Sequence, residues 1–256
     1  MSRKELKKRG RNLLKQKSYW LNVAVVFFMA LNIDSLISIF TTDYEQFFSL
    51  FTLSNFNWEN IKSFLLESNG DDSIADIILS ATITLVDVLI LSIFRVGGTR
   101  YFLKLRKNQV TSFGEVFGDF KNKTAGNIAS VSFIKFLSCM LWTLLGIIPG
   151  IIKIFQYFAV EYILALRPDI TANEALDLSK KLMKGNKLKA VVLDISFIPW
   201  LILSLLTLGI FGYLYVTPYY EATYIEFLSN IREEAIEKQI ISLKDLPDYE
   251  EVIQTT

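Results

Sequence analysis

Polar side chains interrupt one apolar stretch, residues 73–95, at the spacing of a helix. They are Asp76, Ser80, Thr84 and Asp87. At 100° per residue these side chains fall within about 80° of one another, so a helix would present them as one polar stripe. Ionisable groups inside a membrane are functional candidates, and Asp87 would lie near the bilayer midplane. The alternative is structural, with Asp76 at the interface and Asp87 paired inside the bundle, for example with Lys135.

Other apolar stretches also contain charged residues. They are Lys135, Glu161, Asp194 and Glu221. Together with the stripe they form a candidate intramembrane polar site, which could line a cavity. Pro199 and Pro218 should kink the last two stretches, because each proline leaves the carbonyl four residues earlier, of Ile195 or Leu214, without its N–H donor. Such kinks suit a gate, but prolines in transmembrane helices are often purely structural, and we favour that interpretation.

The residues needed for most enzyme chemistry are missing. The chain has no histidine, which removes the usual general base and the usual zinc ligand. Cys139 is the single cysteine, so one chain cannot form a disulfide framework or a cysteine metal cluster. Ser132 and Lys135 have the spacing of a Ser-Lys dyad, but no second site supports it. Glycine-rich phosphate loops and nucleic-acid patches are also missing. We therefore expect no enzymatic activity, no cofactor, no metal and no nucleic-acid partner.

The composition sets the class of protein. Of the 256 residues 52% are hydrophobic, and the mean hydropathy is +0.35, which is typical of a polytopic membrane protein. Six apolar stretches are expected to span the bilayer: residues 18–40, 73–95, 128–147, 151–166, 189–207 and 210–229. We expect an all-α polytopic membrane protein whose six transmembrane helices form three hairpins. The fourth stretch is short, since its residues cover only about 24 Å of a core roughly 30 Å thick.

Charge assigns the sides of the membrane. Lys and Arg concentrate in residues 3–17, 95–123 and 180–189, whereas residues 41–72 hold six acidic groups and one cation. Basic loops stay in the cytoplasm, so both termini are predicted to be cytoplasmic, and each hairpin to follow a basic surface helix on the anionic inner leaflet. The stretch between the last two basic segments must then cross an even number of times. A hairpin with its turn at Pro149–Gly150 satisfies this, whereas one long kinked helix, the competing interpretation, does not.

The surface helix expected before the last hairpin has a defined beginning and end. Thr171 and Glu174 have the spacing of a capping box, in which each side chain bonds to the other's backbone N–H. Gly185 stands where a left-handed C-terminal cap is expected. It belongs to the basic run Lys184, Gly185, Asn186 and Lys187. Earlier in the chain, the pair Gly97–Gly98 is expected to end the second span.

A weak internal repeat accompanies this organisation. Trp142 and Glu161 recur near sixty residues later as Trp200 and Glu221, a pattern typical of parallel repeats in membrane proteins. We divide the chain into four parts. These are residues 1–97, the basic N-terminal helix and first hairpin with its acidic outer loop; residues 98–167, the second repeat unit with the Pro-Gly hairpin; residues 168–230, the third unit with the capped surface helix and hairpin; and residues 231–256, an acidic cytoplasmic tail.

Several motifs resemble one bacterial integral-membrane family. They are Gly97–Gly98, Leu144–Lys153, Glu174–Ala175, Ser179–Lys180, Met183–Lys187, Ser196–Phe197 with Trp200, and Pro218–Tyr219. Over residues 95–228 the chain looks like the family catalogued as domain of unknown function nine hundred seventy-five, common in Gram-positive bacteria. The resemblance implies a plasma-membrane protein and implies no particular activity. Residues 41–72 and the acidic tail fall outside it.

Two functions of different classes stay open. The first is a non-enzymatic accessory, assembly or self-protection factor that acts on lipid or on a membrane partner, or as a homo-oligomer. The second is a small-solute, ion or lipid transporter or channel with a polar intramembrane cavity. Six spans in 256 residues leave little room for a large translocation pathway, which favours the first function. In either case we expect a multi-pass protein of the bacterial plasma membrane.

Overall fold

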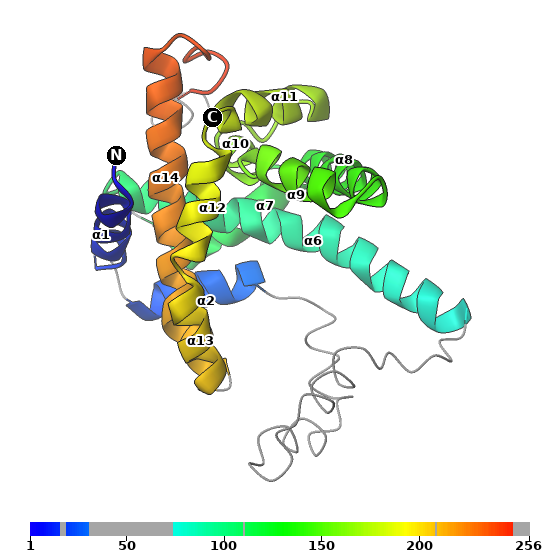
Figure 1. Ribbon diagram of the computed structural model, residues 1–256, viewed down its shortest axis with the longest axis horizontal. Helices are drawn as coiled ribbons and strands as arrows, with labels where there is room; N and C mark the ends of the chain where they lie inside the picture. The colour runs from blue at the N-terminus through cyan, green and yellow to red at the C-terminus, as the bar shows by residue number, and fades with distance from the viewer. Residues whose placement is uncertain (16–18, 31–73, 110, 208, 248–256) are drawn as a thin grey trace. The chain divides into compact units, whose positions relative to one another are not determined.

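The structure is a computed structural model that describes residues 1–15, 19–30, 74–109, 111–207 and 209–247. Within these residues all regular elements are helices, so the expected all-α class is confirmed (Figure 1). The chain divides into two compact units, residues 1–30 with 88–256, and residues 31–87. The predicted acidic outer loop, residues 41–72, lies outside the described residues.

The helices have the following bounds. The first half contains α1 (Arg3–Leu14), α2 (Tyr19–Ala30), α6 (Ile74–Arg106), the 3₁₀ helix η1 (Phe113–Phe117), α7 (Gly118–Lys121) and α8 (Ala125–Leu144). The second half contains α9 (Ile147–Gln156), α10 (Val160–Leu166), α11 (Ala172–Met183), α12 (Lys187–Ile195), α13 (Ile198–Leu206), the π-helix η2 (Gly212–Val216) and α14 (Thr217–Glu237). Short junctions join α8 to α9 and α12 to α13, so the helical segments follow one another closely.

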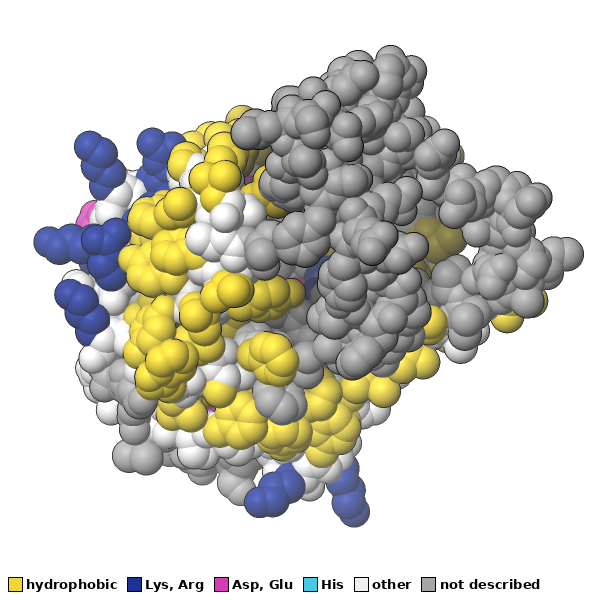
Figure 2. Space-filling view, turned by 90° about the horizontal axis from the view of Figure 1, so that it is seen from below, with side chains coloured by type: hydrophobic (Ala, Val, Ile, Leu, Met, Phe, Trp, Pro, Cys, Tyr) yellow, Lys and Arg dark blue, Asp and Glu magenta, His cyan; other side chains and the backbone are white. Residues whose placement is uncertain are grey.

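Four helical segments are long and apolar enough to cross a membrane. They are Thr82–Arg106, Ala125–Leu144, Ile147–Leu166 and Lys187–Leu206. Many of their apolar side chains face outward, and at the α8–α9 junction Leu144 is 74% exposed and Ile147 is 75% exposed. Figure 2 shows hydrophobic side chains gathered over much of the described part of one face, with Lys and Arg side chains at its edges. Apolar surface of this extent is stable in hydrocarbon rather than in water, so the protein is embedded in a membrane.

Helix α6 continues beyond the expected end of the second span. It is unbroken from Ile74 to Arg106, so the prediction that Gly97–Gly98 ends the span is wrong. The two glycines allow close packing instead. A Cβ on Gly97 would lie 2.5 Å from the carbonyl oxygen of Val116 in η1, and one on Gly98 would overlap the Met29 side chain of α2. The boundary between residues 1–97 and 98–167 therefore falls inside one helix.

The turn between α8 and α9 also differs from the prediction. It lies at Leu145–Gly146, where Gly146 has a φ of +152°, and not at Pro149–Gly150. Pro149 lies in the first turn of α9, where a missing N–H removes no helical hydrogen bond. Gly150 lies inside α9, and a Cβ there would overlap Thr143 of α8. The Pro-Gly pair thus begins the returning helix and lets it lie beside α8 (Figure 1).

The surface helix predicted before the last hairpin is present as α11, whereas the surface helix predicted in the second basic segment is not. The Thr171 hydroxyl accepts from the Glu174 N–H (3.4 Å) and the Glu174 carboxylate accepts from the Thr171 N–H (3.4 Å), so the capping box is present. Gly185 has a φ of +78°, the left-handed cap that was expected. In the second basic segment, two short pieces, η1 and α7, replace one amphipathic helix. Gly114 and Gly118 lie in this segment, and glycine weakens a helix interior.

The first basic helix, α1, buries the face that was expected to lie on the membrane surface. Leu6, Leu13 and Leu14 are buried, and α1 makes its main contact with α14. The two backbones approach closely, since a Cβ on Gly10 would lie 2.8 Å from the backbone nitrogen of Thr223. The leucine stripe of α1 therefore belongs to the protein core.

The predicted acidic tail begins inside α14. Residues 231–237 continue that helix. Arg232 is buried, and its guanidinium donates to the Leu246 carbonyl at 2.9 and 3.2 Å. The first part of the tail is therefore held against α14, while residues 248–256 lie outside the described residues.

We predict that Gly97→Ala lowers the free energy of unfolding by about 1–3 kcal/mol, because the added methyl group would collide with a backbone that cannot rotate away. Unfolding of the purified protein in detergent measures this change. Gly126→Ala is the matched control, since Gly126 also lies in a helix but a Cβ there meets nothing within 4 Å. The control should be neutral or stabilise by up to about 1 kcal/mol. Equal effects of the two changes would show that close packing is not what requires glycine at position 97.

Candidate functional site

An ion pair between α8 and α10 is the centre of the candidate site. The Lys135 ammonium donates to the Glu161 carboxylate (Nζ–Oε1 2.6 Å), and each side chain is 23% exposed. The pair depends on a break in the fourth apolar stretch. Residues 157–159 leave the helical pattern there, and α10 begins with Glu161 in its first turn. Two residues predicted to share a site are thus brought together.

Two further charged residues extend this pair. The charges of Lys135 and Arg95 act on Glu161, and those of Arg95 and Glu161 act on Glu221. Two cations and two carboxylates, from α6, α8, α10 and α14, therefore lie within electrostatic range, and their formal charges cancel. We call Arg95, Lys135, Glu161 and Glu221 the charge network. Arg95 is exposed and also donates to the Met29 carbonyl (3.4 Å).

Arg95 is the member of the charge network that sequence reasoning does not identify. By position it ends the expected second span and joins the basic cytoplasmic segment. In the structure it lies within α6, which continues past Gly97–Gly98. One signal was available, because Lys135 alone cannot neutralise both Glu161 and Glu221, and carboxylates among apolar helices need cationic partners.

Asp194 of α12 has different partners, two tyrosines of α14. Its carboxylate accepts from the Tyr220 hydroxyl (2.9 Å) and from the Tyr224 hydroxyl. The rings of Tyr220 and Tyr224 lie 4.5 Å apart between centroids, and Phe158 packs on Tyr224 at 4.6 Å. The two tyrosines are four residues apart, so they share one helix face. That spacing is visible in the sequence, but it has meaning only once α12 is known to lie beside α14.

Donors from the N-terminal segment bond to backbone carbonyls at both breaks, at Leu214 as predicted and at Ser196 rather than the predicted Ile195. Pro218 lies in the first turn of α14, directly after η2. The Leu214 carbonyl, which this proline leaves without a helical donor, accepts from the Tyr19 hydroxyl. At the break between α12 and α13, the Lys7 ammonium donates to the Ser196 carbonyl (2.7 Å). The first twenty residues therefore satisfy backbone groups in the last two apolar stretches.

The polar stripe of α6 belongs to the unit of residues 31–87. Asp76, Ser80, Thr84 and Asp87 all lie within α6, so helix geometry gives the four positions one face. Thr84 is exposed and Asp87 is half-buried, while the side chains of Asp76 and Ser80 lie outside the described part of the chain. Lys135, suggested as a partner for Asp87, pairs with the carboxylate of Glu161.

The arrangement suits charge neutralisation better than covalent chemistry. Among the residues that the structure describes, no group of three or more Asp, Glu, Cys or His side chains is placed to hold a metal ion. The ammonium of Lys135, which shares the spacing of a dyad with Ser132, donates to the Glu161 carboxylate. Paired charges of this kind link helices to one another.

Charged pairs held among outward-facing apolar helices define a helical integral membrane protein. Residues 147–235 match the family model described as protein of unknown function (DUF975). The matched stretch runs from α9 into α14 and carries Glu161, Asp194 and Glu221, so the resemblance drawn from the sequence is confirmed there. Gly97–Gly98 lies before it. No curated protein and no solved structure matches the chain.

We predict that Lys135→Met or Glu161→Met alone destabilises the protein by about 1–3 kcal/mol, because each leaves one embedded charge without its nearest partner. This range is below the 3–5 kcal/mol of fully buried pairs, since both side chains keep some solvent contact. The double variant should recover most of the loss. Denaturant unfolding of the four proteins in detergent gives the coupling energy, and additive single effects would contradict the assigned pair.

Proposed function

We propose that the protein is a multi-pass protein of the bacterial plasma membrane that acts without catalysis, as an accessory, assembly or self-protection factor working on lipid or on a membrane partner. One observation supports this function best: charged residues among its apolar helices find partners inside the fold. Lys135 pairs with Glu161 at 2.6 Å, and Asp194 accepts two tyrosine hydroxyls. Groups saturated in this way hold helices together and leave little charge to bind a solute.

We further propose that the chain crosses the bilayer six times as three hairpins, with both termini in the cytoplasm. Four helical segments of sufficient length support this topology. In the proposal α2 begins the first span, and η2 with α14 forms the sixth. The second hairpin has the shortest apolar surface for a full crossing. Helix α9 exposes apolar side chains only over residues 147–154, a length of about 12 Å, and α10 is mostly buried in protein. The bilayer must therefore thin beside a hairpin that crosses fully.

Cysteine labelling tests this topology. In a Cys139→Ala background, Leu145→Cys places a thiol in the α8–α9 turn, which should react with a membrane-impermeant maleimide added to intact cells. Leu243→Cys, at an exposed position of the tail, should react only after the cells are permeabilised. A thiol at position 145 that is protected from both sides would contradict the full crossing and indicate a re-entrant helix pair.

A transporter or channel is the second candidate because of where the helices are interrupted. Glu161 follows the break at residues 157–159, and Glu221 follows η2 and Pro218. Interrupted helices beside charged residues are typical of transporter binding sites, and π-helices occur frequently at functional sites. In this alternative the charge network would line the pathway.

Exchanging the ion pair distinguishes the two functions. In cells that lack their own copy of the gene, Lys135→Glu combined with Glu161→Lys should restore the deletion phenotype to the wild-type level, because an accessory factor needs the pair only for packing. Glu221→Gln should restore it as well. If the network carries a solute, both variants should fail although immunoblots show wild-type membrane levels. Deletion of the acidic outer loop, residues 41–72, together with the acidic tail should abolish the accessory function, and an unchanged phenotype would count against it.

A further inference from the structure

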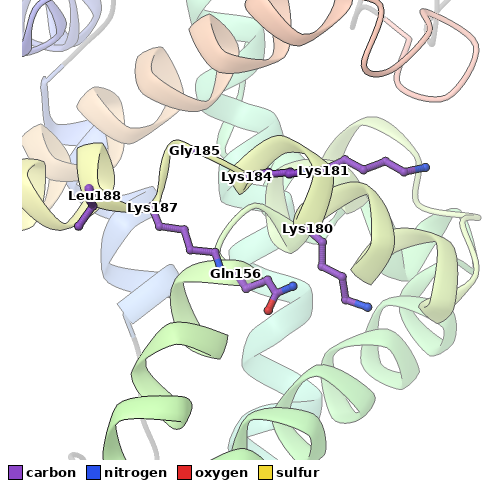
Figure 3. A pocket seen from close by; sticks show the side chains of 7 residues that line it. All are labelled: Gln156, Lys180, Lys181, Lys184, Gly185, Lys187 and Leu188. Carbon is purple, nitrogen blue, oxygen red and sulfur yellow. The ribbon is translucent and has the colours of Figure 1, made fainter.

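A hollow rich in lysine lies where α9, α11 and α12 meet (Figure 3). It has a volume of about 410 Å³. Its lining includes Gln156, Lys180, Lys184, Gly185, Lys187 and Leu188. In Figure 3 the side chains of Lys180 and Lys187 extend on either side of Gln156, so groups from three elements converge on one space.

Most of the positive charge at this hollow is not neutralised by the fold. Lys181 pairs with Asp177 (3.0 Å), but no described carboxylate lies within 4 Å of Lys180, Lys184 or Lys187. The second basic segment differs, since three of its cations have carboxylate partners. These pairs are Arg100–Asp119 at 2.8 Å, Lys104–Glu115 at 2.6 Å and Arg106–Glu226 at 3.4 Å. The hollow therefore concentrates a positive potential that favours an anionic ligand.

The backbone adds donors at the same place. Asn186 stands at the N-cap of α12, but its side-chain amide donates to the Leu182 carbonyl (3.0 Å) and does not cap α12. The first N–H groups of α12 therefore have no side-chain cap, and a helix N-terminus favours negative charge. A Cβ at Gly185 would meet nothing within 4 Å, so a ligand can approach the chain closely there.

Apolar surface continues directly from the hollow. Leu188, which lines it, is 77% exposed, and Val192 and Ile195 are exposed on the same face of α12 at helical spacing. On α9, exposed Ile154 precedes Gln156 by two residues. A ligand that uses both features has a negative head and a hydrocarbon chain, whereas free phosphate would use only the lysines.

We propose that this hollow binds the phosphate group of an anionic phospholipid between Lys180, Lys184 and Lys187, with an acyl chain along the exposed face of α12. The three ammonium groups neutralise the phosphate, and the Gln156 amide can donate to a phosphate or glycerol oxygen. The hollow lies at the beginning of the apolar segment Lys187–Leu206, which suits the depth of a lipid headgroup. The site goes beyond the proposed function, because an accessory factor and a transporter could both hold such a lipid.

Lipid binding by the full-length protein tests the site. Phosphatidylglycerol or cardiolipin is titrated into the protein in neutral detergent micelles, and bound lipid is counted by native mass spectrometry. Lys180→Gln, Lys184→Gln and Lys187→Gln combined should weaken binding about 100-fold, since each lysine near anionic lipid contributes about fivefold. Lys4→Gln, Lys8→Gln and Lys15→Gln combined remove the same charge from exposed positions around α1 and should leave binding nearly unchanged.

The outcomes separate the site from its alternatives. Equal losses in the two combined variants would overturn it, because nonspecific attraction to anionic lipid depends on total charge. Displacement of the lipid by inorganic phosphate or glycerol phosphate at matched concentration would overturn the lipid assignment and indicate a free-anion site. Leu188→Ser should weaken lipid binding, and unchanged lipid binding in this variant would contradict the placement of the acyl chain. Unfolding temperatures should stay at the wild-type value, since none of the three lysines forms a described ion pair.

Discussion

Backbone carbonyls that lose their helical donors must find others when water is scarce, and this constraint determines how the ends of the chain meet. The last two apolar stretches are interrupted, one between α12 and α13 and the other at η2 and Pro218. Lys7 donates to the Ser196 carbonyl and Tyr19 to the Leu214 carbonyl. Gly10 is required for this arrangement, because only a residue without a Cβ lets α1 approach α14 so closely. The N-terminal helix therefore belongs to the same structural unit as residues 147–235, although it lies far outside the stretch that matches the family.

The same requirement for partners explains the embedded charges. One unpaired charge among apolar helices would be strongly unfavourable, whereas Lys135 and Glu161 pair at 2.6 Å, and Arg95 and Glu221 lie within electrostatic range of the pair. The group draws on four helices, and its members stand far apart in the sequence. It can therefore form only when α6, α8, α10 and α14 have assembled. Hydroxyl donors replace cations at Asp194, which shows two different solutions to the same electrostatic problem within one bundle.

Features that act within one helical turn could be predicted from the sequence. The capping box of Thr171 and Glu174 and the left-handed Gly185 depend only on neighbouring residues, and both are present. The apolar stretches and the charged residues inside them could be identified for the same reason. Features that depend on a distant neighbour could not. Gly97–Gly98 has the composition of a helix end, but its role is set by Val116 and Met29, and the tyrosine partners of Asp194 come from another helix.

The Pro149–Gly150 pair shows that the same two residues can belong either to a turn or to a helix. Proline and glycine both favour turns, yet each also has a place in a helix, proline in its first turn and glycine wherever another helix approaches. The turn is instead made three residues before Pro149, at Gly146, whose φ is +152°. Once α9 begins there, its N-terminal turn accepts Pro149 without loss and Gly150 must fit against Thr143.

The basic segments also differ in how their charge is used after folding. By the positive-inside rule the Lys and Arg of the three basic segments are expected to retain those segments in the cytoplasm, and acidic neighbours matter little. After folding, Arg100, Lys104 and Arg106 are neutralised by carboxylates, so the second segment becomes part of the packed protein. Lys180, Lys184 and Lys187 form no such described pairs, and their charge stays available at the surface. The number of Lys and Arg residues therefore serves to predict an orientation, whereas only the ion pairs of the folded protein show which lysines have no described carboxylate partner.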